Sequence, residues 1–451
     1  MEDDGFVLVS REEISQYPCP DHVPGEVEET SNSNNFASEI DIYIESLAEP
    51  LWELNHFIHE NPELAFKEYK AHQALTDYLQ SREEGWHITP SACGLETAWM
   101  AVYDSGRNGP VVSFNVEMDA LPKLGHACGH NLIATASMAA GLATVELMKR
   151  YSMPGKVIIL GTPGEEGLGG GKIQLLKRGA YRGIDISLIS HPGILNNSPL
   201  VRTTAFARLE VEFFGRAAHG SKNPWMGINA LDALVVSYNA VSALRQQTKP
   251  GDVIGLAITN GGEQATNVIH AYAACVCMIH ATTSSRLAEL QSKVSSCFRA
   301  GAVATGATVN ITVTPGYQDH VPNRVLAASY KRYWNMLPDP PDPPLPPEGQ
   351  YTWVKSSTDQ GDLSHALPSV NASFAIPPGP EAGQPHSPDF EKASGTREAF
   401  ARALRVGKAL AGTAIDVLTI PGLLDEVKKQ WRRDMEAERE QQSEQFSEYL
   451  E

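Results

Sequence analysis

The sequence is poor in long apolar runs, in clustered cysteines and in positive charge. No apolar stretch approaches the ~20 residues that a membrane-spanning helix needs, so we expect no membrane partner. The six cysteines lack the spacing of a disulfide framework, which predicts reduced thiols. A formal net charge of −18 argues against nucleic acid or an anionic membrane surface as a partner. The acidic start, Met1 to Gly5, lacks the basic and apolar order of a signal peptide, so a cytoplasmic location is expected.

The chain does have the composition of a globular protein, with 42% hydrophobic and 20% charged residues. Its 451 residues exceed one hydrophobic core, so two domains are expected. Changes of pattern along the chain predict four regions. They are a disordered leader (1–35), a discontinuous main domain (36–202 and 316–420), an inserted domain (203–315) and a charged, solvated C-terminal helix (421–451).

The main domain alternates apolar strands with helices. Strands are predicted at 111–116, 156–161 and 184–189, with helices at 134–151 and 172–180 between them. This βαβαβ order predicts an α/β fold with a largely parallel mixed sheet and helices on both faces. Upstream, residues 37–82 have helical spacing, and Pro50 predicts a kink or a break in it.

The inserted domain shows more of the polar–apolar alternation of strands with one solvated face. It predicts a smaller α+β unit, with strands near 207–213, 253–260, 270–281 and 307–314 and helices at 230–246 and 284–300. The proline-rich run 338–347 predicts an extended surface loop.

Polar residues follow each of the three predicted parallel strands. The segment 117–131 holds Asp119, Cys128 and His130, and the last two are spaced to reach one metal ion while Asp119 orients a ligating imidazole. Glu165 and Glu166 follow the second strand, and His191 follows the third. Taken singly, each has an ordinary alternative: a buried thiol, a solvated acidic turn, a loop histidine. Together they predict one site, because parallel strands bring their carboxyl ends to the same edge.

These motifs resemble a known family. Gly-His-Ala-Cys-Gly-His-Asn at 125–131, Thr-Pro-Gly-Glu-Glu-Gly at 162–167 and Ser-His-Pro at 190–192 are similar to those of dinuclear metal amidohydrolases. That family includes aminoacylases, hippurate and auxin-conjugate hydrolases and glutamate carboxypeptidases. The similarity runs from about residue 40 to 415 and is greatest to the β-alanyl and acyl-amino-acid dipeptidase branch. It implies a zinc-exopeptidase-like catalytic domain with an inserted lid and dimerisation domain.

The resemblance also implies roles for individual residues. Cys128, His130, Glu166, His191 and the distant His386 would be metal ligands, and Glu165 the general base, with Asp119 orienting a ligand. Two divalent ions would activate a water and polarise the substrate carbonyl. Zinc suits these ligands best, and manganese is the alternative. Taken without the family, His386 would be a surface loop residue among prolines.

The inserted domain matches the family's lid, which implies a homodimer. There His219 would reach the substrate oxyanion and Asn267 would touch substrate; without the family, both would be ordinary turn residues. The chain departs from the pattern at two positions. Many relatives have a histidine where Glu117 stands, and an arginine that grips the substrate carboxylate where His280 stands. Since histidine cannot reproduce the bidentate arginine fork, recognition of a free carboxylate is in doubt.

The leading hypothesis is therefore a metal-dependent hydrolase that cleaves the amide bond of a small N-acyl amino acid, dipeptide or related amide. The same residues could run amide formation in reverse. A catalytically inactive binding or scaffold relative is the competing class. A thiol-nucleophile enzyme using Cys128 is a third, and it would leave Glu165, Glu166 and His386 without a role.

Overall fold

The computed structural model describes residues 31–82, 85–167, 169–262 and 265–448. The chain divides into two compact units. Unit 1 consists of Met1–Thr203 and His320–Met435, and unit 2 of Thr204–Asp319 and Glu436–Glu451.

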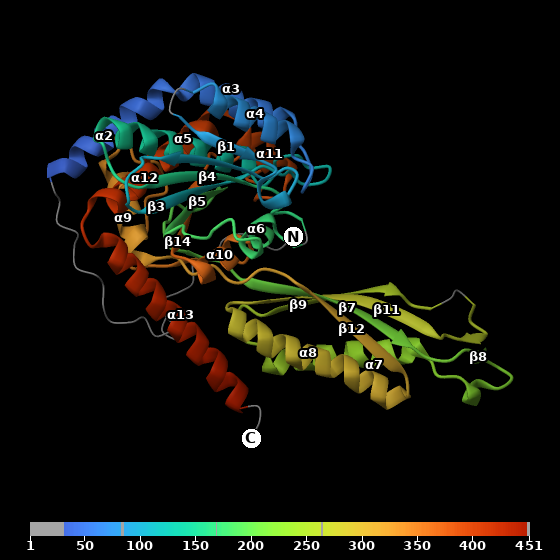
Figure 1. Cartoon of the computed structure of the whole chain (residues 1–451). Helices are drawn as coiled ribbons and strands as arrows, with labels where there is room; N and C mark the ends of the chain where they lie inside the picture. Colours follow the sequence, from blue (N-terminus) through green and yellow to red (C-terminus); the bar gives the residue numbers. More distant parts are fainter. Residues whose placement is uncertain (1–30, 83–84, 168, 263–264, 449–451) are drawn as a thin grey trace. The chain divides into compact units, whose positions relative to one another are not determined.

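Unit 1 is built on a six-stranded sheet in the order β1-β2-β4-β3-β5-β14 (Figure 1). Its strands are β1 (His87–Pro90), β2 (Trp99–Asp104), β3 (Val111–Glu117), β4 (Lys156–Thr162), β5 (Ile186–Gly193) and β14 (Ser369–Ala375). Strands β4, β3, β5 and β14 run parallel, while β1 and β2 form an antiparallel edge. The predicted largely parallel mixed sheet is thus confirmed.

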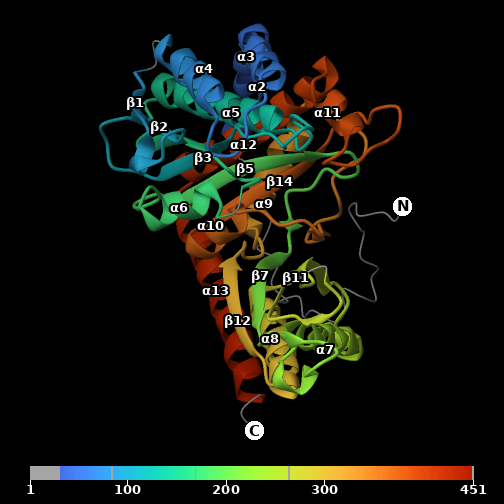
Figure 2. The same cartoon turned by 90° about the vertical axis from the view of Figure 1, so that its right-hand side faces the viewer.

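Helices cover both faces of this sheet (Figure 2). Helices α5 (His130–Arg150) and α12 (Arg397–Thr419) lie on one face, and α6 (Gly171–Lys177) and α10 (Gln360–Ala366) on the other. Three further helices pack around α5 and α12: α2 (Ser31–Ser46), α3 (Ala48–Glu60) and α9 (Arg324–Met336). Helix α4 (Tyr69–Gln80) packs against α3 and the strands β1 and β2. Burial from both sides explains why β3 and β14 are buried almost throughout.

The two faces differ in chemistry. Under α5 and α12 the core is apolar, and small residues let α5 approach the sheet closely. A Cβ at Gly141 of α5 would lie 2.5 Å from Ile159 Cδ1. Under α6 and α10 there is a smaller apolar cluster, which includes Leu175 and Leu363, and also a layer of buried polar side chains. In that layer Asn115 Nδ2 donates to Ser187 Oγ at 2.9 Å and to Gln360 Oε1 at 2.8 Å. Such a buried layer is favourable because its groups are paired. The site described below is an extension of this polar layer.

Unit 2 contains a four-stranded antiparallel sheet in the order β12-β7-β11-β9. Its strands are β7 (Ala205–Phe214), β9 (Val253–Asn260), β11 (Tyr272–Ala281) and β12 (Thr308–Pro315). Helices α7 (Ala230–Ala243) and α8 (Ser284–Thr305) cover one face, as Figure 1 shows. Alternating burial along β7 reflects this one-sided cover. The remaining elements of the two units are η1 (Ala92–Gly94), β6 (Val201–Arg202), β8 (Ala218–His219), η2 (Pro224–Met226), η3 (Leu244–Gln247), β10 (Val268–Ile269), β13 (Thr352–Trp353), α11 (Pro388–Ser394) and the long helix α13 (Leu423–Glu448).

Some expectations about the chain's ends need correction. The expected leader lies mostly outside the described residues, but helix α2 already begins at Ser31, inside the range assigned to the leader. The C-terminal helix α13 is not solvated throughout: Leu423 and Val427 are buried, and Trp431 Nε1 donates to the backbone oxygen of Ser364 at 2.8 Å. Its first part up to Met435 therefore belongs to unit 1, although the composition is highly charged.

The expected break near Pro50 is present, since α2 ends at Ser46 and Pro50 falls in the first turn of α3. The expectation about apolar runs was wrong for α5, because this helix is long and apolar enough to cross a bilayer. The bent helix pair Arg397–Thr419 and Leu423–Glu440 reaches that length and apolar character only if the two helices are counted as one span. Since 94% of the apolar window of α5 is buried, the helix has the burial of a core helix.

Candidate metal centre and active site

Parallel pairing brings the predicted polar segments to one edge of the sheet. Glu117, the last residue of β3, pairs with Thr162, the last residue of β4, directly before the turn that holds Glu165 and Glu166. His191 lies near the end of β5, on the other side of β3. The structure thus confirms that the three strand ends converge at one edge of the sheet.

Cys128 and His130 are placed by the start of helix α5. Gly129 between them has φ 75°, and a Cβ there would lie 2.5 Å from the Pro192 side chain, so the turn requires glycine. His130 is the first residue of α5 and is fully buried. Across the edge, Cys128 Sγ lies 3.3 Å from His191 Nε2.

Asp119 holds two of the segments together. Its Oδ1 lies 3.2 Å from His130 Nδ1, so the ring directs Nε2 away from Asp119. The same carboxylate accepts the backbone N–H groups of Glu165 at 3.2 Å and Glu166 at 2.8 Å. One buried side chain therefore fixes both the orientation of the His130 ring and the backbone of the acidic turn, as expected for an orienting carboxylate.

His386 reaches the site from the loop before α11. Its Nε2 lies 3.3 Å from Glu166 Oε1, and its backbone N–H donates to the oxygen of Ala127 at 2.8 Å. Burial acts to raise the pKa of Glu166, but the close contact with His386 and the charge of His130 outweigh it and lower that pKa to about 2. Glu166 is thus an anion placed between two imidazoles.

Among the described residues, four sets of donor atoms could each hold a cation, and two of them share Cys128. One of these two is Cys128, His130 and His191, and the other is Cys128, Glu166 and His386; within each, the donor atoms lie within 4.8 Å of one another. His130 Nε2 and Glu166 Oε1 are buried and make no well-formed hydrogen bond; their polar contacts are ion pairs, at 3.4 Å to Glu117 Oε2 and at 3.3 Å to His386 Nε2. Burying such atoms is costly unless a ligand satisfies them. Sulfur, imidazole and carboxylate donors together would suit divalent transition-metal ions.

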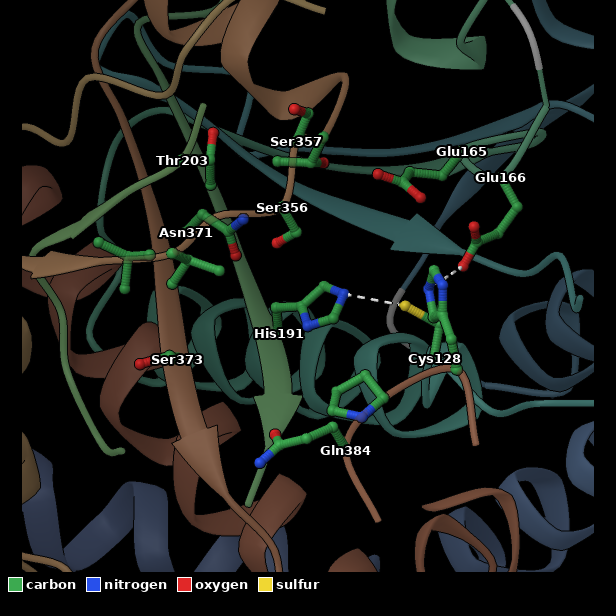
Figure 3. Close-up of a pocket in the computed structure, with 15 residues that line it drawn as sticks. Cys128, Glu165, Glu166, His191, Thr203, Ser356, Ser357, Asn371, Ser373 and Gln384 are labelled. Atoms are coloured by element: carbon green, nitrogen blue, oxygen red, sulfur yellow. Dashed lines mark hydrogen bonds and ion pairs between the residues drawn. The ribbon is translucent and has the colours of Figure 1, made fainter. Parts of the chain in front are cut away.

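The side chains of Glu165 and Glu166 leave the turn in different directions (Figure 3), although one oxygen of each lies within 4.8 Å of the other and of a ring nitrogen of His130. Burial raises the pKa of Glu165 well above its ordinary value, and the nearby charges of Glu117, Glu166 and Asp359 act in the same direction. A carboxyl group with a raised pKa beside a cavity is suited to take up and return a proton.

Sequence reasoning missed a buried ion cluster beneath Glu165. Lys172 of α6 is fully buried, and its Nζ donates to Glu117 Oε1 at 2.6 Å and to Asp359 Oδ1 at 2.5 Å. Burial acts to raise the pKa of Glu117, but the charges of Lys172 and His130 outweigh it, so that pKa is lowered. Glu117 is therefore a paired anion. The only signal in the sequence was a lysine in the short apolar run of α6.

Glu68 is a second residue that the sequence did not reveal. Its Oε1 accepts the backbone N–H groups of Phe66 at 2.7 Å and Gly164 at 2.9 Å, and its Oε2 accepts the hydroxyl of Thr97 at 2.6 Å. Burial raises its pKa to about 7, against the hydrogen bond from Thr97. Glu68 therefore fixes the turn that carries Glu165 and Glu166.

A cavity of about 380 Å³ opens beside these groups within unit 1 (Figure 3). Its lining combines donor residues of the metal centre with hydroxyl and amide side chains. The lining residues are Cys128, Glu165, Glu166, His191, Val201, Thr203, Val354, Ser356, Ser357, Thr358, Asn371, Ser373, Gln384, Pro385 and His386. A volume of this order is at the lower end for small-molecule sites.

The three substrate residues expected in the insert all lie in unit 2. His219 and Asn267 are neighbours there: His219 pairs with Val268, and the Gly220 N–H donates to the Asn267 oxygen at 2.7 Å. His280 lies on β11 and stacks on Phe206 at 5.4 Å between ring centroids. None of the three is among the residues that line the cavity of unit 1, and their contact with substrate stays a prediction.

Comparison with known proteins identifies the family. Residues 202–305 match the family model described as a peptidase dimerisation domain. A solved Bacillus subtilis protein, described as a dinuclear metal binding peptidase of the M20 family, superposes with a TM-score of 0.63 at 18% identity, covering 83% of this chain and 99% of that one. The Xaa-Arg dipeptidase of Mus musculus is 36% identical over 405 residues, which is 88% of this chain and 92% of the mouse protein. The chain belongs to the M20 peptidase family.

This M20 peptidase is also 29% identical to one subunit of the p-aminobenzoyl-glutamate hydrolase of Escherichia coli, covering 64% of this chain and 62% of that protein. The resemblance inferred from the motifs is confirmed, as is the expectation of a metal-dependent hydrolase acting on amide or peptide bonds. The chain contains a peptidase dimerisation domain, which occupies most of unit 2. Membership of a family of hydrolases disfavours the scaffold hypothesis.

Proposed function

We propose that this M20 family member is a dipeptidase or N-acyl amino acid hydrolase that uses two divalent metal ions. The observation that carries the proposal is the pair of donor sets that share Cys128, with the buried His130 Nε2 and Glu166 Oε1 left without a well-formed hydrogen bond. These atoms are costly to bury in a protein that binds no metal.

Each side chain has a separate task in this proposal. Cys128, His130 and His191 would hold one ion, and Cys128, Glu166 and His386 would hold the other. When bound, the ions would lower the pKa of a water molecule and polarise the substrate carbonyl. Asp119 keeps the His130 ring in place through Nδ1. Glu165, whose carboxyl lines the cavity, takes the proton from the attacking water and passes it to the leaving amine.

The ligand set supports zinc as the native metal, because a thiolate and three imidazoles prefer it over harder cations. Manganese is the alternative, since a carboxylate is also present. The raised pKa of the Cys128 thiol, caused by burial and by the charge of Glu166, disfavours a free thiolate nucleophile. A thiol enzyme would keep its activity in a chelator, whereas a metallopeptidase would lose it.

The proposal also covers the substrate, the oligomeric state and the location of the protein. The names of the relatives direct the first substrate panel to Xaa-Arg dipeptides and p-aminobenzoyl-glutamate. The dimerisation domain match supports a homodimer through unit 2, in which His219 and Asn267 contact substrate. The five described cysteines are free thiols, which supports a reducing, cytoplasmic location.

The first experiment is elemental analysis of gently purified protein, for wild type and for Cys128→Ser. We expect close to two zinc or manganese ions per wild-type chain and a clear fall in the variant, because both donor sets lose their shared ligand. A wild-type chain that holds no metal and cannot be reloaded would contradict the proposal.

A second variant separates metal binding from proton transfer. Glu165→Gln should keep both ions and lose hydrolysis by about 10²–10⁴-fold, because the amide cannot accept the proton. Hydrolysis rate and metal content are measured on the same preparation. Substantial turnover in this variant would remove Glu165 from the role of general base.

A further inference from the structure

Asn371 lies on the same side of the sheet as His191. It pairs in parallel register with Ile189 of β5, two residues before His191, while Ser373 pairs with His191 itself. Alternation along a strand places all four side chains on one face, with Asn371 roughly 7 Å further from the metal edge. In Figure 3, Asn371 lies on the opposite side of His191 from Cys128.

The amide of Asn371 is buried but has an unused acceptor. The residue is 5% exposed, and its Oδ1 has no hydrogen-bond partner although it lines the cavity. Gln384 repeats the pattern from the loop before α11, with Oε1 buried and without a partner. A buried carbonyl oxygen without a donor costs stability, so such atoms are candidates for ligand contacts.

Three of the five hydroxyl side chains that line the cavity are engaged within the fold. Thr203 Oγ1 accepts the N–H of His320 at 3.1 Å, and Thr358 Oγ1 accepts the N–H of Gln360 at 3.2 Å. Ser373 Oγ contacts the backbone oxygen of Ser198 at 3.5 Å. The two amide oxygens therefore differ from these three neighbours in having no partner.

The charge of the wall points to the same class of ligand. Among the described residues that line the cavity, none is lysine or arginine. A substrate carboxylate would find no cation there apart from the metal centre, whereas an N–H group would find two acceptors. Acceptor oxygens discriminate strongly against an analogue that lacks the donor, because they would stay unpaired.

We propose that Asn371 determines specificity by accepting hydrogen bonds from a nitrogen-rich substrate side chain, either a guanidinium or a neutral ureido or carboxamide group, and that Gln384, on the other side of His191 in Figure 3, offers a second acceptor along the cavity. This deepens the proposed function and rests on it. The two sources share N–H donors and differ in charge. Since the acceptors are uncharged amides, the donors and not the positive charge are what the wall recognises.

Three matched dipeptides test the proposal on the metal-loaded protein. They share one N-terminal residue and end in arginine, in citrulline or in norleucine, which supply charged donors, neutral donors and no donors. We expect kcat/KM for the arginine and citrulline peptides to exceed that for the norleucine peptide by roughly tenfold or more. Equal values for citrulline and norleucine would overturn the proposal.

Variants assign the effect to the amide. Asn371→Leu keeps the approximate volume and should lower kcat/KM roughly tenfold for the arginine and citrulline peptides while leaving the norleucine peptide within about twofold. Asn371→Asp keeps an acceptor and should recover the arginine peptide more than the citrulline peptide. Asn310→Leu changes an exposed strand asparagine of unit 2 and is the control for surface effects. An equal fall for all three peptides in Asn371→Leu would show a structural role only.

Binding measurements separate this inference from the proposed function. Glu165→Gln, loaded with metal, is titrated calorimetrically with the same three peptides. If wild type hydrolyses none of them, the proposed dipeptidase activity fails, but tighter binding of the arginine and citrulline peptides would still support recognition by the amides. Equal affinities for all three peptides would refute that recognition.

Discussion

The buried lysine beneath the acidic turn offers a demanding test of the structure. Lys172→Met keeps much of the side-chain volume but removes the Nζ that contacts Glu117 at 2.6 Å and Asp359 at 2.5 Å. Both carboxylates are at most 1% exposed, and with Glu165 they form a group whose oxygens lie within 4.8 Å of one another. Removing one partner of a buried ion pair costs about 3–5 kcal/mol, which is a large part of the 5–15 kcal/mol typical of a domain.

The loss of stability in Lys172→Met should depend on pH. In the wild type, burial acts to raise the pKa of Glu117 but the charge of Lys172 keeps it lowered, whereas burial already raises the pKa of Asp359 to about 6 against the charge of Lys172. Without Lys172 the pKa of Asp359 rises further, and that of Glu117 rises above its unfolded value as well. Protonation of these two carboxyl groups then stabilises the folded state. This stabilisation is fully present when the pH is below their pKa in the unfolded chain, and it is lost as the pH rises through their pKa in the folded protein. The variant's deficit relative to wild type should therefore be largest near pH 8 and shrink towards pH 5.

The assay is denaturant unfolding at both pH values with a chelator present, because bound metal would add its own free energy. Lys428→Met is the matched control: Lys428 is half-buried and its Nζ lies 2.5 Å from Asp185, and its loss should cost about 1 kcal/mol or less. A Lys172→Met deficit as small as the control's, or one that does not change with pH, would refute the reasoning.

Two other predictions concern the carboxylates that hold the site. Glu68→Gln should stabilise the protein at pH 8 relative to wild type, because the pKa of Glu68 is raised by burial to about 7 and the folded state loses the benefit of protonation as pH rises through that value. The raised pKa of Glu68 corresponds to about 3 kcal/mol of unfolding free energy. Denaturant unfolding of both proteins between pH 5 and 8 measures the difference, and a difference that does not change with pH would contradict the raised pKa of Glu68. Asp119→Asn should weaken metal affinity about 10–100-fold, because the amide can no longer accept from the His130 ring and both backbone N–H groups, and competition with a chromogenic chelator reports the change. Unchanged affinity would show that the ring is held by other contacts.

Much of the fold followed from local pattern. Burial on both faces made β3 and β4 nearly continuous apolar runs, and the alternation of β7 reflected a sheet covered on one side. The C-terminal helix was misjudged because charge dominates its composition, while the few residues that anchor it, such as Leu423 and Val427, are spaced too sparsely to stand out. Its partners lie far away in the chain, and local pattern carries no information about them.

The site divides in the same way. Residues in dense motifs, such as Cys128 and His130, could be picked out because several chemical groups fall within a few positions. Lys172, Glu68 and Asn371 could not, since each gains its meaning from a neighbour across the fold: a carboxylate on another strand, a backbone N–H of the acidic turn, a cavity wall. Single polar residues in apolar segments are common, and only tertiary contacts distinguish them.

The position of His130 at the first turn of a buried helix has a consequence for how the protein handles its metal supply. In small zinc modules the ion organises the chain, and removing it unfolds the domain. Here the ligand positions follow from a helix and strands that have an extensive apolar core of their own. The side chains that bind the metal lose their conformational entropy when the chain folds, before any ion binds. Metal can therefore leave and return without the chain unfolding, so that its availability acts as a reversible on–off control of a persistent scaffold.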